Sequence, residues 1–159
     1  MKKDIDDSLN KKIYECNRHI ETIKSAKEFL KPIMPLTVEK YLKIDKFQSS
    51  FIDQLIFRFS KLQDTIGESI LKAILIKSQE NVERMTFLDI LNRLEKLELL
   101  DKNQWLELRE LRNNIAHEYS FNHDEVVENI NLIYKRVDEL IDIFHNLYNF
   151  IKTLDKKYS

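Results

Sequence analysis

The stretch DEVVENINLIYKRVDELIDIFHNLYNFI, residues 124–151, carries an apolar side chain at every third or fourth position. This spacing matches the roughly 3.6 residues per turn of an α-helix, so the apolar side chains form one long stripe. The stripe consists of Val126, Ile130, Ile133, Val137, Leu140, Phe144, Leu147 and Ile151. A helix with such a stripe needs apolar partners along its whole length, which predicts a bundle of long helices.

The composition favours the same all-α class. One Gly and two Pro among 159 residues leave few turn positions, and the length suits a single domain over residues 1–159. The formal net charge of −1 means that any nucleic-acid binding has to come from a local basic site. The lone Cys16 excludes an internal disulfide and favours a reducing compartment. With no long apolar run and no secretory signal pattern, we expect a cytoplasmic protein without a membrane segment.

Start and stop signals divide the chain into about five helices. Pro32 and Pro35 end the first helix, and Thr37 is a candidate cap for a short turn at residues 38–42. Asp101 or Asn103 can cap the fourth helix, and Asn122 or Asp124 the last. The sequence predicts an antiparallel bundle with main helices at about 8–30, 46–78, 86–100 and 104–117, and a last helix that begins at residue 122 or 124 and carries the long apolar stripe.

The helix predicted at residues 46–78 has more apolar surface than one neighbour needs. Two stripes run along it: Phe51, Leu55, Leu62, Ile66 and Ala73 in the first, and Ile52, Ile56, Phe59, Ile70 and Ile74 in the second. Gly67, at the edge of the second stripe, would let another helix approach closely. Either the helix lies in the centre of its own bundle, or part of it forms a homodimer interface, and the pattern favours neither.

Arginines interrupt two of the buried faces. On the fourth helix this face is defined by Trp105, Leu108, Leu111 and Ile115, and Arg112 falls inside it, while Arg109 flanks its edge. Arg58 falls within the first stripe of the second helix. A buried guanidinium keeps its charge, so it needs a paired anion, a water-filled cleft or a second subunit. Two inward arginines indicate a shared polar cavity, unless each extends its head to water along a packed stem.

Two further reactive groups follow Arg112 closely. His117 lies five residues later, about 140° round an ideal helix, and Tyr119 returns to the same face as Arg112. Arg112 and His117 can therefore act together only if the helix ends near His117 or if copies from two subunits meet. A guanidinium can hold a phosphate and an imidazole can move a proton at neutral pH, which indicates phosphate chemistry.

At these residues the sequence resembles the HEPN superfamily, whose signature is an arginine and a histidine separated by four to six residues. Arg112-Asn-Asn-Ile-Ala-His117 has this spacing, and the extension to Tyr119 gives the Arg-x4-His-x-Tyr form of HepT-like toxins. The segment Arg58-Phe-Ser-Lys-Leu-Gln-Asp64, followed by Gly67, is also similar to the second helix of this group. The resemblance covers most of the chain and implies a HEPN-like four-helix core.

The resemblance implies a homodimeric, metal-independent ribonuclease toxin without a cofactor. Arg112 would hold the scissile phosphate, His117 would assist attack by the ribose 2′-hydroxyl, and Asn113 would orient the site. Tyr119 would accept AMP from a partner MNT-type nucleotidyltransferase that acts as antitoxin. Arg109, Arg58 and Asp64 are expected in supporting roles.

Two other readings stay open. The chain can keep this fold without catalysis, as a helical binding partner, or substrate-binding subunit, of a small nucleotidyltransferase. It can also be a structural bundle in which the motif is coincidental. No metal site is predicted, because the remaining histidines are isolated and lack ligand spacing.

Overall fold

The computed structural model describes residues 2–115 and 122–158, and within these ranges every regular element is a helix. The all-α class predicted from the sequence is therefore confirmed. In chain order the elements are α1 (Lys2–Leu30), the short 3₁₀ turn η1 (Lys31–Ile33), α2 (Val38–Lys43), α3 (Lys46–Thr65), the π-helical segment η2 (Ile66–Ile70), α4 (Leu71–Lys77), α5 (Phe87–Lys96), α6 (Lys102–Asn114) and α7 (His123–Tyr158).

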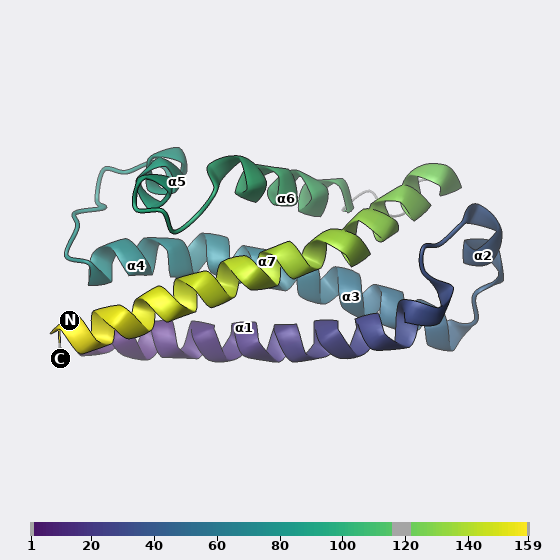
Figure 1. Ribbon diagram of the computed structural model, residues 1–159, viewed down its shortest axis with the longest axis horizontal. Coiled ribbons are helices and arrows are strands. Elements are labelled where there is room, and N and C mark those ends of the chain that lie inside the picture. Colours follow the sequence, from purple (N-terminus) through teal and green to yellow (C-terminus); the bar gives the residue numbers. More distant parts are fainter. Residues whose placement is uncertain (1, 116–121, 159) are drawn as a thin grey trace.

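Four long helical segments alternate in direction along the molecule (Figure 1). Helix α1 runs one way, the continuous α3–η2–α4 rod returns, α6 runs parallel to α1, and α7 returns to the end where the chain began. Helix α3 packs against α1, α6 and α7, and α7 also packs against α1 and α6. The short α5 lies beside α4 and α6. None of the described helices carries an apolar run of the length that crossing a membrane requires.

Side-chain caps set several helix starts, as the sequence predicted. Thr86 and Asp89 form a reciprocal capping box at α5, although Asp stands where Glu or Gln is usual. At α6 the cap is Asp101, whose carboxylate accepts a hydrogen bond from a backbone N–H three residues later. At α7 the Asn122 side chain accepts the equivalent hydrogen bond. These contacts resolve the two alternatives that the sequence left open at α6 and α7.

Three predicted boundaries differ from the structure. Helix α1 begins at Lys2 instead of near residue 8, and its first turns are held to the last turn of α4, at the same end of the bundle, by an ion pair from Asp6 to Lys77 at 2.7 Å. Helix α5 ends at Lys96 instead of near Leu100, because Glu98 takes a positive φ of 60° and closes a Schellman turn. Helix α6 ends at Asn114, three residues before the predicted end.

Most of the two apolar stripes predicted for residues 46–78, which run along α3, η2 and α4, is buried within one chain. Seven members of these two stripes are at most 4% exposed: Ile52, Leu55, Phe59, Leu62, Ile66, Ile70 and Ile74. A position in the centre of the bundle therefore accounts for these residues, and they do not by themselves require a second subunit. The homodimer remains a prediction from the family resemblance.

The π-helical segment η2 changes which face of the rod is buried. Its last hydrogen bond runs from the Leu71 N–H to the Ile66 carbonyl, five residues back, where an α-helix would use four. The extra residue rotates everything after it by about 100°. Leu71 and Leu75, outside both predicted stripes, are fully buried, while Ala73 from the first stripe is only half-buried.

Candidate functional site

Arg112 and Asp64 form a two-pronged ion pair between α6 and α3. The guanidinium donates from Nε to Asp64 Oδ1 at 3.1 Å and from Nη2 to Oδ2 at 3.2 Å. The two side chains are 30% and 31% exposed, so the pair lies at the surface of the bundle with its packed side covered. Of the three partners predicted for an inward Arg112, the structure provides the paired anion.

This pairing fixes the position of the cation more than a single contact would. Parallel N–H donors to two carboxylate oxygens restrain both the distance and the plane of the guanidinium. Hydrogen bonding to Asp64 raises the pKa of Arg112, and burial opposes this only in part. Arg112 is therefore a permanent, oriented positive charge in the last turn of α6.

The chain leaves the α-helix directly after this charge. Helix α6 ends at Asn114 with Ile115 as its C-cap, and the buried face predicted for it is confirmed by Trp105, Leu108 and Leu111. Asn113 is exposed, beside Arg112. Residues 116–121, which include the predicted His117 and Tyr119, lie outside the described residues.

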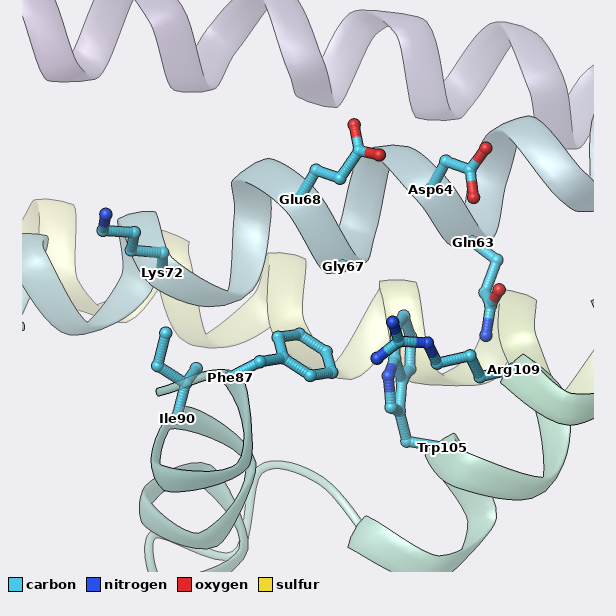
Figure 2. A pocket seen from close by; sticks show the side chains of 9 residues that line it. All are labelled: Gln63, Asp64, Gly67, Glu68, Lys72, Phe87, Ile90, Trp105 and Arg109. Atoms are coloured by element: carbon cyan, nitrogen blue, oxygen red, sulfur yellow. The ribbon is translucent and has the colours of Figure 1, made fainter. Parts of the chain in front are cut away.

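A pocket of about 430 Å³ lies beside the ion pair, between η2, α5 and α6 (Figure 2). Asp64 belongs both to the ion pair and to the lining of this pocket. The pocket lining consists of Gln63, Asp64, Gly67, Glu68, Lys72, Phe87, Ile90, Trp105 and Arg109. The lining thus combines two aromatic rings with two acidic and two basic residues.

Two buried N–H donors in this lining have no hydrogen-bond acceptor among the described residues. They are Gln63 Nε2 and Trp105 Nε1, on side chains that are only 3% and 1% exposed. Leaving such a donor unpaired in the interior costs about 1–3 kcal/mol. Buried polar groups are nearly always paired in folded proteins, so two unpaired donors on one pocket point to an external acceptor.

Gly67 sets the depth of the pocket. A Cβ atom at this position would lie 3.0 Å from Cζ2 of Trp105, closer than packed carbon atoms normally come. Gly67 thus leaves room for the indole of Trp105 on α6, whereas the expected close approach of another helix at this position remains a prediction. Gly67 also lies inside η2, and single π turns occur preferentially at functional sites.

Arg109 forms the outer wall of the pocket with Phe87. Its guanidinium lies over the Phe87 ring, 5.0 Å from the ring centre, in the arrangement of a cation–π contact. Arg109 is exposed and lies one turn after Trp105 on α6, so its head can move without disturbing the core. The structure thus places Arg109 in the lining of the same pocket as Asp64, and its supporting role remains a prediction.

Arg58 has a different partner. Its Nη1 lies 3.1 Å from Nδ1 of His19 on α1, and its guanidinium lies 5.7 Å from the centre of the exposed Phe57 ring. Burial, and then the positive charge of Arg58, lower the pKa of His19, which favours a neutral imidazole that accepts the hydrogen bond. The cavity shared by Arg58 and Arg112 remains a prediction, because the described pocket is lined by Arg109 instead.

Gln63 was not singled out from the sequence, although a signal for it exists. The second apolar stripe of this helix passes from Phe59 to Ile70 without an intervening member. Steps of four residues from Phe59 lead to Gln63 and then to Gly67, so an amide and a glycine occupy the vacant positions. Among the described residues, Gln63 is the buried polar side chain of the bundle.

No group of three or more His, Cys, Asp or Glu side chains within residues 2–115 and 122–158 is arranged to hold a metal ion. Comparison of the chain with known protein families, with curated proteins and with solved structures finds no significant match.

Proposed function

We propose that this protein is a HepT-like ribonuclease toxin that cleaves RNA as a homodimer, without a metal ion or cofactor. The observation that carries the proposal is the guanidinium of Arg112, which Asp64 holds by two hydrogen bonds at the end of α6. In this position Arg112 begins the Arg-x4-His-x-Tyr motif, and the helix ends before the motif is complete.

In the proposed reaction Arg112 binds the scissile phosphate and offsets the negative charge that develops on it. Asp64 accepts hydrogen bonds from Nε and Nη2, and in this proposal the N–H groups of Nη1 donate to a phosphate oxygen. The carboxylate of Asp64 also offsets part of the positive charge of Arg112. In this proposal the site therefore favours an anion that hydrogen-bonds to Arg112 over one held by charge alone.

His117 supplies the proton transfer in this proposal. Its imidazole takes the proton from the ribose 2′-hydroxyl as that oxygen attacks phosphorus. The bond from phosphorus to the 5′-oxygen breaks, leaving a 2′,3′-cyclic phosphate on one product, and the 5′-oxygen takes up a proton and departs as a hydroxyl. A 2′-hydroxyl is required, so DNA is not a substrate.

The end of α6 at Asn114 supports this pairing of groups. In a straight helix, His117 would lie about 140° away from Arg112, on another face. Helix α6 ends at Asn114, three residues before His117, so the proposal does not require a straight helix through the motif. A second copy of the chain then supplies the opposite wall of the cleft, which makes the homodimer part of the proposal.

In this proposal, modification of Tyr119 inactivates the toxin. The partner nucleotidyltransferase would join AMP to the phenol oxygen, which attacks the α-phosphorus of ATP and releases pyrophosphate. The added nucleotide brings bulk and negative charge next to Arg112, where an RNA phosphate would otherwise bind.

Expression in a bacterial host without the partner tests the proposal. We expect growth arrest with the natural sequence and normal growth with Arg112→Ala or His117→Ala. The matched controls are Arg18→Ala and His145→Ala, which replace exposed residues on α1 and α7 and should leave the arrest intact. Normal growth with the natural chain, together with intact RNA in the purified protein's presence, would overturn the toxin assignment and favour a non-catalytic nucleotidyltransferase partner.

A further inference from the structure

The pocket between η2, α5 and α6 combines three features that the ion pair of Arg112 and Asp64 does not use. Two of its lining residues carry buried N–H donors, Gln63 Nε2 and Trp105 Nε1, that have no acceptor within the part of the chain that the structure describes. Its wall is the ring of Phe87, and its outer edge carries Arg109 and Lys72 (Figure 2). Its volume of about 430 Å³ falls within the range of about 300–1,000 Å³ typical of small-ligand sites.

We infer that this pocket binds a nucleobase, with a preference for bases that carry a ring carbonyl. Two N–H donors require acceptors, and the carbonyl oxygens of uracil, cytosine and guanine can each accept two hydrogen bonds, whereas each ring nitrogen of adenine accepts one. The flat ring of a base also suits the face of Phe87, because stacking on aromatic side chains is how proteins hold unpaired bases.

Arg109 marks where the base would lie. Its planar guanidinium occupies the face of Phe87 at 5.0 Å, the place that a stacked base would take. Both orphan nitrogens are shielded from water in this arrangement. In the inferred complex Arg109 swings outward from the Phe87 ring and the base takes its place beside them. Because Arg109 is exposed and at the rim, the displaced guanidinium can then pair with a phosphate of the same nucleotide.

The position of the pocket links it to the proposed reaction. Asp64 lines the pocket and also holds Arg112, so a base in the pocket lies next to the proposed phosphate site. In an RNA strand such a base belongs to a nucleotide close to the cleaved bond, which makes the pocket a selector of the cleavage sequence. This last step rests on the proposed function, whereas base binding does not.

Trp105 provides a direct readout, because it is the only tryptophan in the chain. Purified protein is titrated with each of the four ribonucleoside 5′-monophosphates and with short single-stranded RNA, while Trp105 fluorescence is followed at the red edge of indole absorption. We expect a saturable change with the uracil, cytosine or guanine nucleotides and a weaker effect with adenine. A stronger response to the RNA than to the same mononucleotide identifies a strand as the source of the base, and equal responses identify a free nucleotide.

The matched variants are Gln63→Met and Gln54→Met, two amides of the same helix α3, of which only Gln63 faces the pocket. Methionine has a similar volume and no donor, so Gln63→Met should weaken nucleotide binding at least about 10-fold. Its melting temperature should stay the same or rise, because an unpaired buried donor is lost. Gln54 is exposed, so its variant should bind as the natural chain does.

The inference is overturned if no nucleotide or RNA changes the fluorescence saturably, if adenine binds best, or if Gln63→Met binds as tightly as Gln54→Met. Arg112→Lys separates this inference from the proposed function. RNA cleavage should be lost in that variant while the mononucleotide response remains. If the natural chain binds nucleotides but cleaves no RNA, the ribonuclease proposal is overturned and the base pocket stands. If it cleaves RNA but binds no nucleotide, the base pocket is overturned and the ribonuclease proposal stands.

Discussion

Asp64 and Arg112, 48 positions apart in the sequence, face each other through two hydrogen bonds at 3.1 and 3.2 Å. The contact joins α3 to α6 at the point where α6 ends. It holds a permanent cation in a fixed plane, with about 30% of each side chain exposed. The proposed chemistry depends on this arrangement, and the pair can be tested separately from activity.

A double-mutant cycle should reveal coupling between the two side chains. Asp64→Asn, Arg112→Gln and the double variant are compared by urea denaturation. Because both groups are partly exposed, we expect a coupling free energy of only about 1 kcal/mol. The control is the exposed pair Lys43 and Glu39 on α2, at 3.2 Å, whose coupling should be smaller. Equal coupling in the two cycles would show that Asp64 does not restrain Arg112.

The substitution Gly67→Ala should have opposite effects on the melting temperature in the natural chain and in a Trp105→Phe variant. In the natural chain, Gly67→Ala places a Cβ 3.0 Å from Cζ2 of the fully buried indole, which has little room to shift. We expect this clash to outweigh the gain of about 1 kcal/mol in helix propensity, so the melting temperature falls. In a Trp105→Phe background the same substitution should raise it, because the contacted ring atom is gone. A rise in both backgrounds would show that the close contact is not limiting.

His19 should contribute a pH dependence to stability. Its pKa in the folded protein is lowered by burial and by the positive charge of Arg58, whereas in the unfolded chain the pKa of the same side chain is about 6.5. Between these two values the unfolded state binds more protons, so the stabilisation is complete above about pH 6.5 and is lost as the pH falls.

The variant His19→Gln isolates this contribution, because its amide oxygen can still accept from Arg58. The unfolding free energy of the natural chain, measured relative to His19→Gln, should decrease between about pH 7.5 and about pH 5. A difference that stays constant across this range would contradict the neutral, half-buried state of His19. Other titrating groups are common to both proteins and largely cancel.

Cys16 should be inert in the folded protein. Its side chain is fully buried, and burial is the main cause that raises the pKa of the thiol to about 12. Since the thiolate is the reactive form, alkylation at mildly alkaline pH should be slow until denaturant is added. The measurement is the mass increase after treatment with iodoacetamide, with and without urea. Rapid labelling of the native chain would mean that α1 opens locally.

Local signals in the sequence were enough to predict the helices. The complete stripe predicted for α7 is buried, from Val126 to Ile151, because apolar spacing depends only on the helical period. The helix caps could be predicted because they are also local, since each cap side chain bonds to a backbone N–H three residues away. The examples are Thr86 with Asp89 at α5 and Asp101 at α6. Arg112 can also be identified from the sequence, because a charged residue within an apolar helix face conflicts with the pattern around it.

Features that depend on tertiary contacts were not predictable in this way. The π turn at η2 adds one residue to the helical period, and no local pattern distinguishes it from a continuous helix. Glu98 takes the left-handed conformation that usually signals glycine, so the end of α5 was misplaced. The partner of Arg58 is on α1 and the partner of Arg112 on α3, and neither choice follows from spacing within one helix.

RNA cleavage by the purified protein, in buffer containing EDTA, tests the central claim most directly. The account predicts RNA products that end in a 2′,3′-cyclic phosphate, no cleavage where the attacking ribose is replaced by deoxyribose, and a rate at least about 100-fold lower in both Arg112→Lys and His117→Ala. Arg18→Lys and His145→Ala, which alter exposed residues elsewhere, should cleave as the natural chain does. Intact RNA with the natural chain, or equal cleavage by the Arg112 and His117 variants, would contradict the account.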